Sequence, residues 1–360
     1  RLAEAAFGIS DKNPFAQEAL TNAYLSGPFY YFLPSHEGRL QNLCFSPDGR
    51  YLASGGKGEV VRLTDIQKLW ANPDAPEEAF VPLEYPSEKR FTDIWETNFD
   101  HTGKRLIVCG KNTAKEGWML MWNMQGKLLR EFKHGGDLQA CLFSPNDSLI
   151  ITGDEDGTAR IWTPDGKFIE ANKKHSDVVN RLSWSKDGRY WLTASYDGLV
   201  RVFDTNGIMV QELAGHTEMV HHARFSPDGK YVVSCSNDKK VIVWEVATGK
   251  PFRTLGKHKK KVRRVEFSPD GTLIVTASND NTAMLWDWQK DVAITLNGHT
   301  NWIYWVQFSP DGNYFITSGY DGLAIIWDRK GKPIAKLKGH RQQVQHAAIS
   351  PDTARFLAAT

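Results

Sequence analysis

Cysteine is scarce in this sequence, and no two cysteines are spaced to form a metal-binding pair. The four are Cys44, Cys109, Cys141 and Cys235, with no Cys-x-x-Cys motif among them. This spacing excludes a four-cysteine zinc site of the usual kind. Such sparse, separated cysteines favour a reducing compartment, so we expect a cytoplasmic protein.

The sequence also lacks a long apolar run, a signal-peptide pattern and a strong net charge. No apolar stretch approaches the ~18 residues of a membrane-spanning helix, so we expect no membrane partner. The residues after Arg1 show no basic, apolar and small-residue succession typical of a secretion signal. The 44 Lys and Arg are balanced by 42 Asp and Glu, for a formal charge of +2. Any basic binding site must therefore be local.

Motifs for cofactors are missing as well. There is no Gly-x-x-x-x-Gly-Lys-Ser/Thr loop that would cradle a nucleotide phosphate. His221 and His222 are adjacent on an expected strand, so their side chains point to opposite faces and cannot chelate one metal. We expect no cofactor and no metal site.

What the chain does have is a repeat of 41 or 42 residues. Histidines recur at this step: His134, His175, His216, His258, His299 and His340. An aromatic residue recurs at the end of an apolar stretch: Trp162, Phe203, Trp244, Trp286 and Trp327. An Asp precedes each aromatic by six residues: Asp156, Asp197, Asp238, Asp280 and Asp321. A hydroxyl residue precedes each by ten: Thr152, Thr193, Ser234, Thr276 and Thr317. Four positions in register over five units are the signature of a repeat architecture.

Each unit reads as four short strands. In one unit these are residues 220–225, 231–235, 240–244 and 251–255, rich in β-branched and aromatic residues. Ser-Pro-Asp-Gly turns follow the first strand at 46–49, 226–229, 268–271 and 309–312. Four strands in roughly forty residues are typical of one blade of a β-propeller.

The dipeptides Gly215-His216, Trp286-Asp287 and Trp327-Asp328, with the Ser/Thr and Asp between them, resemble the WD-repeat family. The resemblance covers residues 29–360 and implies an all-β fold, a WD-repeat β-propeller of four-stranded antiparallel blades. Seven repeats are complete and an eighth is truncated. Eight blades are favoured over seven, with a strand at 29–34 closing the ring. Alternatively, seven blades close and the eighth unit begins a second disc.

The first two repeats depart from the pattern. The first has Thr64 in place of the aromatic and Gly58 in place of the Asp, followed by an insertion at 67–78. The second ends in Trp122 but has a longer turn at 111–117. We expect both to lack the hydrogen-bond network of the other blades.

The repeated Ser/Thr, His and Asp look like a hydrolase triad, but a catalytic set is needed once and this set occurs five times. A buried Trp indole needs an acceptor, which a Ser/Thr hydroxyl supplies while bonding His and, through it, Asp. In the family this tetrad is structural, and we expect no catalytic residue. The expected tetrads are Thr152, His134, Asp156 and Trp162; Ser234, His216, Asp238 and Trp244; Thr276, His258, Asp280 and Trp286; and Thr317, His299, Asp321 and Trp327. Because Phe203 lacks an indole, blade four should be the weakest, and Phe203→Trp should raise its melting temperature.

The resemblance also implies one docking face, formed by the starts of the innermost strands and the turns before the repeated Asp. By position, the candidate ligand-binding residues are Trp302, Tyr304, Tyr320, Lys261, Arg263, Met219, His221, Tyr196 and Trp95. The aromatics of blade seven adjoin the basic run 258–264 of blade six. An aromatic patch beside a cationic one suits an acidic peptide or protein loop.

Residues 1–28 predict a short α-helical hairpin, a linker from an upstream region, with Asn13-Pro14 as a helix start. Short Ala-rich helices leading into propeller repeats resemble the junction in bacterial STAND-type (NACHT- or NB-ARC-like) signalling ATPases. That resemblance implies a propeller that senses a ligand and restrains a switch.

The expected function is a non-catalytic scaffold for protein or peptide interaction, or a ligand-sensing regulatory propeller within a larger multidomain signalling protein. The partner would be a protein or peptide on one face, or a neighbouring domain of the same chain. Two alternatives remain open: a propeller hydrolase with a central active site, and a nucleic-acid-binding propeller using the basic run of blade six. Neither alternative is favoured.

Overall fold

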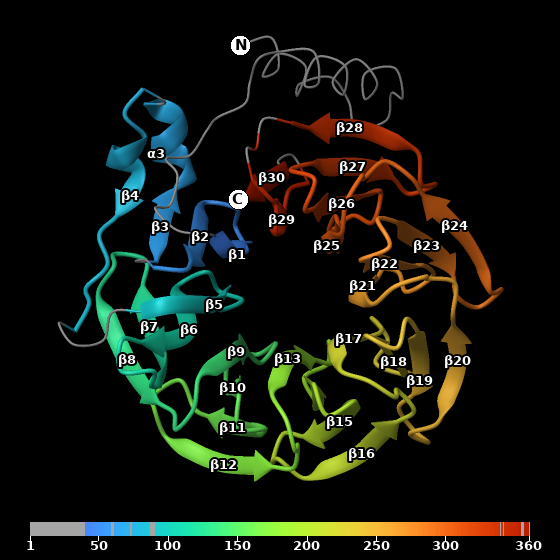
Figure 1. Cartoon of the computed structure of the whole chain (residues 1–360). Coiled ribbons are helices and arrows are strands. Elements are labelled where there is room, and N and C mark those ends of the chain that lie inside the picture. Colours follow the sequence, from blue (N-terminus) through green and yellow to red (C-terminus); the bar gives the residue numbers. More distant parts are fainter. Residues whose placement is uncertain are drawn as a thin grey trace. The chain divides into compact units, whose positions relative to one another are not determined.

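Seven four-stranded antiparallel sheets surround a common axis in the computed structural model of the chain (Figure 1). The structure describes residues 40–58, 61–72, 74–86, 91–338, 340, 342–353 and 356–359. The chain divides into two compact units, residues 1–35 and 36–360, and every described residue belongs to the second. The helical hairpin predicted for 1–28 and the strand predicted for 29–34 lie outside the described residues.

Each sheet is one blade of a β-propeller, and its strands run in sequence order from the axis outward (Figure 1). Blades one to three are β1 (Leu40–Phe45), β2 (Tyr51–Gly56), β3 (Arg62–Asp65) and β4 (Phe80–Val81); β5 (Phe91–Phe99), β6 (Arg105–Asn112), β7 (Gly117–Asn123) and β8 (Leu128–Lys133); and β9 (Leu138–Phe143), β10 (Ile150–Asp154), β11 (Thr158–Trp162) and β12 (Phe168–Lys173). Blades four and five are β13 (Val179–Trp184), β14 (Tyr190–Ser195), β15 (Leu199–Asp204) and β16 (Met209–Ala214); and β17 (Val220–Phe225), β18 (Tyr231–Ser236), β19 (Val241–Glu245) and β20 (Pro251–Leu255). Blades six and seven are β21 (Val262–Phe267), β22 (Ile274–Ser278), β23 (Ala283–Asp287) and β24 (Val292–Leu296); and β25 (Ile303–Phe308), β26 (Tyr314–Gly319), β27 (Ala324–Asp328) and β28 (Pro333–Leu337).

The eighth repeat contributes two strands and not a blade. β29 (His346–Ile349) pairs with β30 (Phe356–Ala359) in a sheet that has no third strand among the described residues. β29 contacts β25 and β26 on one side and β1 on the other. The propeller therefore has seven complete blades, and the prediction of eight is wrong. The period of the repeat gives the number of repeats in the sequence. It does not give the number of strands that each repeat contributes, which decides the number of blades.

The hydrophobic core lies between neighbouring blades. One cluster joins Val275 and Leu285 of blade six to Val306 and Phe315 of blade seven. Clusters of the same kind join each other pair of consecutive blades. The alternating apolar residues of each strand thus pack against the next blade, which gives every sheet a partner for both faces.

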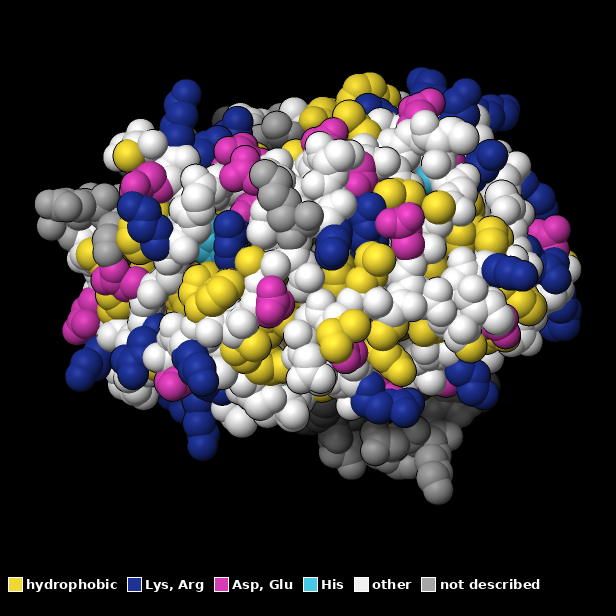
Figure 2. All heavy atoms as spheres, turned by 90° about the horizontal axis from the view of Figure 1, so that it is seen from below, with side chains coloured by type: hydrophobic (Ala, Val, Ile, Leu, Met, Phe, Trp, Pro, Cys, Tyr) yellow, Lys and Arg dark blue, Asp and Glu magenta, His cyan; other side chains and the backbone are white. Residues whose placement is uncertain are grey.

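Apolar side chains are also exposed on the rim, where the outer strands lie. Phe168 on β12 and Ile208 just before β16 are examples, and Figure 2 shows such residues interspersed with Lys and Arg. Singly scattered apolar residues are ordinary on protein surfaces. We therefore assign the rim no function.

The Ser-Pro-Asp-Gly turns fix the register of the first two strands of a blade. In blade five, Ser226 Oγ donates to Asp228 Oδ1 at 2.5 Å and accepts from the Tyr231 backbone amide at 3.0 Å. Gly229 has a φ of 70°, in the left-handed region that glycine adopts readily. The same serine–aspartate bond recurs at Ser46, Ser268 and Ser309.

Blades one and two are stabilised by contacts of their own. The insertion of blade one forms α3 (Ile66–Ala71) and the 3₁₀ helix η1 (Pro76–Ala79). The Asp65 carboxylate caps α3 by accepting from two backbone amides of its first turn at 3.0 and 3.3 Å. In blade two the buried Trp122 indole donates to the Glu84 carbonyl at 2.7 Å, so its donor is satisfied without a Ser/Thr.

No helix in the described part of the chain is long and apolar enough to cross a membrane.

Blade four has Phe203 at the position of the repeated tryptophan, and a different tryptophan packs against it. Trp191 on β14 is fully buried and stacks on Phe203, with ring centroids 4.4 Å apart. Its indole donates to the Asp204 carbonyl at 2.7 Å. The space that an indole at position 203 would need is therefore already filled.

Phe203→Trp is consequently expected to destabilise the protein by about 1–3 kcal/mol through overpacking against Trp191. This reverses the expectation from sequence, which considered only the missing donor. The double variant Trp191→Phe/Phe203→Trp should recover stability, because it keeps the total ring volume and places an indole near Thr193. Urea unfolding of both variants tests this; a higher melting temperature for the single variant would contradict it.

Candidate functional site

Three blades contain an unbroken hydrogen-bonded chain from Trp to Asp. In blade five the Trp244 indole donates to Ser234 Oγ at 2.7 Å. The other end of the chain links Ser234 Oγ to His216 Nε2 at 2.8 Å and His216 Nδ1 to Asp238 at 2.9 Å. Equivalent contacts join Thr276, His258, Asp280 and Trp286 in blade six and Thr317, His299, Asp321 and Trp327 in blade seven. Burial acts to raise the pKa of Asp238, but the hydrogen bond and charge of His216 outweigh it and lower that pKa to about 2.

The burial of the hydroxyls gives these chains a structural role. Ser234, Thr276 and Thr317 are fully buried, and each already accepts an indole N–H. A nucleophile must reach its substrate, which these hydroxyls cannot do where they lie. The chains instead tie two strands of a blade to the loop that precedes its innermost strand, with each buried polar group paired.

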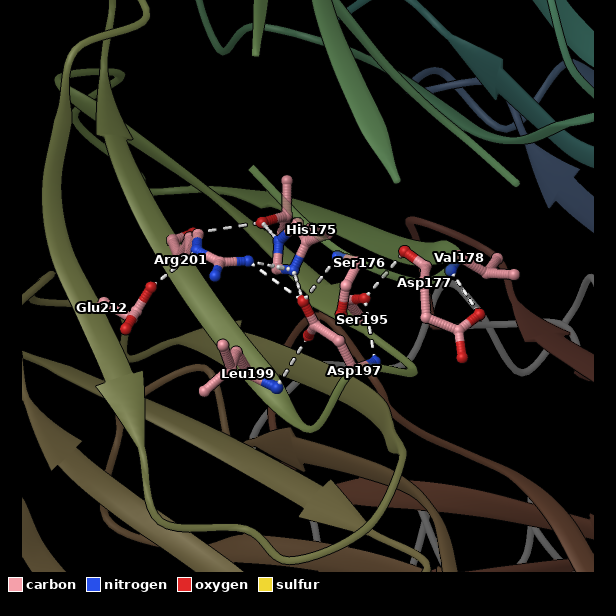
Figure 3. Close-up of polar contacts among 10 residues, drawn as sticks. His175, Ser176, Asp177, Val178, Ser195, Asp197, Leu199, Arg201 and Glu212 are labelled. Carbon is pink, nitrogen blue, oxygen red and sulfur yellow. Dashed lines mark hydrogen bonds and ion pairs between the residues drawn. The ribbon is translucent and has the colours of Figure 1, made fainter. Parts of the chain in front are cut away.

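Blade four carries a charged variant of the chain (Figure 3). His175 Nε2 lies 2.6 Å from Thr193 Oγ1, and His175 Nδ1 lies 2.8 Å from Asp197. Arg201 extends the chain outward, with Nη1 3.1 Å from Asp197 and Nε 2.9 Å from Glu212 on β16. This arginine links the inner loop to the outermost strand, which the indole does not do in the other blades.

Blade three does not form the predicted tetrad. The Trp162 indole donates to Thr152 Oγ1 at 3.1 Å, as expected. His134, however, makes no hydrogen bond to Asp156; its Nδ1 lies 3.1 Å from Arg160 Nη1. His134 Nε2 is buried and has no partner among the described residues. The assignment of Asp156 and His134 to a tetrad is therefore wrong.

The cause is a buried ion pair. Arg160 is paired with the fully buried Asp154 carboxylate, two residues after Thr152. The later repeats have no carboxylate at that position, which is Ser195, Ser236, Ser278 or Gly319. The pairing with Asp154 places Arg160 beside His134 Nδ1, where the carboxylate of Asp156 was expected. Burial and the charge of Arg160 lower the pKa of His134 to about 3.

The predicted docking face is built on a bulge that recurs at the start of the innermost strands. The pairing of β17 with β18 skips His221, that of β21 with β22 skips Arg263, and that of β25 with β26 skips Tyr304. A bulge leaves the extra residue out of the ladder and re-aims its side chain. Three of the predicted face residues are therefore in equivalent, displaced positions on neighbouring blades.

Five of the predicted residues form one contiguous cluster, which we call the aromatic–basic patch: Lys261, Arg263, Trp302, Tyr304 and Tyr320. The Tyr304 and Tyr320 rings stack at 5.0 Å, and Trp302 lies 5.4 Å from Tyr320. Arg263 lies over Tyr304 at 5.1 Å and Lys261 over Trp302 at 6.0 Å. Each cation is thus within cation–π range of a ring on the next blade.

Further predicted residues continue this patch toward blades five and four. Arg263 donates to Asn279 Oδ1 at 3.0 Å, and its Nη1 lies 3.3 Å from His221 Nε2. His221 Nε2 also lies 2.7 Å from Asn237 Oδ1, and Tyr196 meets the His221 ring edge-on at 5.7 Å. Burial and the charge of Arg263 lower the pKa of His221 to about 4. The face is therefore a connected row of side chains and not a set of separate ones.

Part of this face is open to a ligand. Trp302 is 36% exposed and Met219 is 40% exposed. Beside the patch lies a hollow of about 370 Å³, lined by Tyr320, Asp321, Gly322, His340, Gln342 and Gln343. The stacked tyrosines form one wall of this hollow through Tyr320, so a ligand on the rings could extend into it.

Trp95 belongs to a different part of the ring. Its indole donates to Asp137 at 2.9 Å, and Lys111 lies over its ring at 5.7 Å. These contacts join blades two and three, whereas the aromatic–basic patch spans blades six and seven.

The basic run 258–264 is not a continuous basic surface. His258 is buried in the blade-six tetrad, and Arg264 is only 7% exposed. Residues 259–260 are exposed, and the remaining two cations belong to the aromatic–basic patch. The described residues contain no group of three or more His, Cys, Asp or Glu side chains placed to hold a metal ion.

Three relatives show what the chain is similar to. Protein HIR1 of Candida albicans is 26% identical over 201 residues, which are 48% of this chain and 21% of that protein. The small ribosomal subunit protein RACK1 of Drosophila melanogaster is 32% identical over 96 residues, 26% of this chain and 28% of that protein. The periodic tryptophan protein 2 homolog of Caenorhabditis elegans is 28% identical over 90 residues, 24% of this chain and 10% of that protein. The chain therefore covers less than a third of the length of each.

The family comparison reaches much further along the chain. Six segments match the WD domain, G-beta repeat, at residues 27–65, 126–163, 166–204, 207–245, 249–287 and 290–328. Together they make up more than half of the sequence. The last five segments follow the repeat period, and each spans the outermost strand of one blade and the three inner strands of the next. The chain belongs to the WD-repeat family of β-propellers.

Proposed function

We propose that this propeller is a non-catalytic interaction module that recognises a protein or peptide through the aromatic–basic patch. The observation that carries the proposal is the contiguity of Trp302, Tyr304 and Tyr320 with two cations, on bulged strands of a rigid ring. Aromatic residues give a large contact area at little cost in conformational entropy, and they dominate the energetics of interfaces. Relatives whose names place them in protein assemblies, such as the ribosomal subunit protein, are consistent with this role.

The chemistry of the patch favours an acidic partner. Among the described residues, neither Lys261 nor Arg263 has a carboxylate oxygen within 4.0 Å. Partial burial and then the nearby charge of Arg263 lower the pKa of Lys261. A carboxylate from a partner would relieve this and would pair with cations already oriented by the rings.

The test removes the rings and compares the loss with a matched control. The patch variant is Trp302→Ala/Tyr304→Ala/Tyr320→Ala, and the control variant Trp70→Ala/Phe168→Ala/Ile208→Ala removes exposed apolar side chains elsewhere on the propeller. Partners captured from lysate by the wild-type protein are identified, and the affinity of each purified partner is then measured. The patch variant should lose about 30-fold or more in affinity, the size of a hot-spot truncation. Equal losses in both variants would refute the site.

Salt dependence separates a protein partner from a nucleic acid. Phosphate contacts release counterions, so binding of nucleic acid falls by orders of magnitude between low and moderate salt. We expect a shallow dependence, because only two cations of the patch are exposed to a ligand. A steep linear fall of log affinity with log salt would instead identify the captured partner as nucleic acid.

The wider setting is also a proposal. We infer a cytoplasmic, ligand-sensing propeller in a larger signalling ATPase from the resemblance of residues 1–28 alone. Here the partner is a neighbouring domain of the same chain, and its displacement by ligand biases a switch. Adding that domain in trans should then compete with a captured partner for the aromatic–basic patch, and independent binding of the two would contradict this setting.

A further inference from the structure

A second set of polar side chains lies one residue beyond the bulged positions. On five consecutive innermost strands these residues are Arg181 (β13), His222 (β17), Arg264 (β21), Trp305 (β25) and His346 (β29). All five occupy equivalent positions, each directly after a bulged or strand-entry residue. The innermost strands surround the propeller axis (Figure 1). We call these five residues, with Arg224 two positions further along β17, the axial cluster.

Three members of the axial cluster, Arg264, Trp305 and His346, are in contact from blade to blade. The Arg264 guanidinium lies 3.1 Å above the centre of the Trp305 ring, and its Nε donates to the Val306 carbonyl at 3.2 Å. The Trp305 and His346 ring centroids are 3.4 Å apart. The charge of Arg181 on β13 lowers the pKa of His346 on β29, after burial and the charge of Arg264. Because β13 and β29 lie on opposite sides of the ring (Figure 1), this electrostatic effect acts across the propeller axis.

The arginines of the cluster have no compensating carboxylate at contact distance. Among the described residues, no Asp or Glu oxygen lies within 4.0 Å of a guanidinium nitrogen of Arg181, Arg224 or Arg264. The nearest acidic groups act on Arg264 only at longer range: Glu96 and Glu266. Glu266 is itself buried, which raises its pKa, and it accepts from the Phe308 backbone amide at 3.1 Å. Three cations thus face two more distant carboxylates.

Several buried donors of the cluster lack a partner as well. His222 is 2% exposed, and the Val265 backbone is the one hydrogen-bonding group that acts on its ring among the described residues, so at least one ring nitrogen has no partner there. The same holds for Nδ1 of His346, which is 4% exposed, and for the Trp305 indole nitrogen. A buried polar group left unpaired destabilises the fold, so such groups usually mark a bound water or ion. Unpaired N–H donors next to uncompensated arginines match an anion with several oxygens.

We propose that the axial cluster binds one small oxyanion of the inorganic phosphate class, held by the three arginines and by N–H groups of His222 and Trp305. Arginine forks and imidazole donors pair with tetrahedral oxyanions through several charge-assisted hydrogen bonds. Arg181 and Arg224 are partly exposed, whereas Arg264 and His222 are buried. The site is distinct from the aromatic–basic patch, which uses the preceding residue of the same strands.

The test is calorimetric titration of the 360-residue protein with inorganic phosphate in a chloride buffer. Arg224→Gln is the informative variant, because this arginine is partly exposed and forms no ion pair within the described residues. Arg189→Gln is the control, since it removes an arginine that is 75% exposed on the surface of blade four. Wild type and Arg189→Gln should bind one phosphate with equal affinity, and Arg224→Gln should weaken binding about tenfold or more.

A second readout locates the anion. Imidazole nitrogen resonances of His222 and His346 should shift on addition of phosphate in wild type and in the triple patch variant alike, which separates this site from the proposed function. Absence of saturable binding in the wild-type protein up to about 10 mM phosphate would overturn the proposal and leave buried water as the partner of these donors. Equal affinities of Arg224→Gln and Arg189→Gln would overturn it too.

Discussion

Thr276→Val is expected to lower the free energy of unfolding by roughly 2–5 kcal/mol, although valine has the same shape as threonine. The Thr276 hydroxyl accepts from the Trp286 indole at 3.1 Å and bonds His258 Nε2 at 2.8 Å. The hydroxyl, His258 and Trp286 are all buried. Removing the hydroxyl therefore leaves two buried polar groups unpaired without opening a cavity, so the loss reports hydrogen bonding alone.

The same substitution in blade three is the matched control. Thr152 accepts from the Trp162 indole at 3.1 Å but does not bond His134. Thr152→Val leaves only one donor unpaired, on an indole that is itself partly exposed, and should cost about 0.5–2 kcal/mol. Urea unfolding with unchanged m values measures both losses. Equal losses in the two variants would show that the chain through His258 adds nothing.

The distribution of intact chains around the ring bears on function. Blades five, six and seven have complete tetrads, and blades six and seven carry the aromatic–basic patch. Binding side chains on loops and bulges need a rigid support to stay oriented. In blade seven the Asp321 turn that follows Tyr320 is anchored by His299 at 2.9 Å. The tetrads thus hold in place the turns that present the patch.

The sequence predicts the repeats, their strands and three of the four expected tetrads, because each depends on spacing within one blade. It fails where a second residue competes for the same place. Asp156 has the expected spacing from His134, but Asp154 and Arg160 form a buried ion pair that takes over the contact. Phe203 lacks an indole donor, but Trp191 fills its surroundings. Such competition is decided by packing, which spacing does not encode.

The arrangement of the residues proposed for the docking face is predictable to the same extent. His221, Arg263 and Tyr304 were selected by their position relative to the first apolar residue of a strand, and a recurring bulge brings them together. The axial cluster was not selected, because its residues meet only across different blades. A usable signal exists: Arg264 and His222 align at one repeat position, where an apolar or small residue would be expected in a packed strand.

Because of the different contacts in blade three, His134 should contribute much less to stability at neutral pH than the tetrad histidines do. His134→Phe should cost no more than about 1.5 kcal/mol at pH 7, because it removes the single contact of Nδ1 with Arg160 and an Nε2 that is already unpaired. His216→Phe, at the same repeat position in blade five, should cost roughly 2–5 kcal/mol, because Ser234 and Asp238 each lose one hydrogen bond to the buried ring. Comparable losses of unfolding free energy in the two variants would contradict the conclusion that His216 is fully hydrogen-bonded and His134 is not.

The same residue should make the protein sensitive to mild acid. His134 has a pKa of about 3 when folded, through burial and the charge of Arg160, against an ordinary value of ~6.5 when unfolded. Below pH ~6.5 this histidine is therefore protonated in the unfolded chain but still neutral in the folded protein. The free energy of unfolding falls with decreasing pH until the pH reaches about 3. Between pH 7 and pH 4 this single group should account for a loss of about 3 kcal/mol. Urea unfolding at both pH values should show that His134→Phe loses less stability on acidification than the wild-type protein by about that amount. The lowered pKa values of His221, His222 and His346 leave a residual loss in the variant, in the same direction. If the wild type and His134→Phe lose the same unfolding free energy between pH 7 and pH 4, then solvent reaches His134 and the residue is protonated in the folded state.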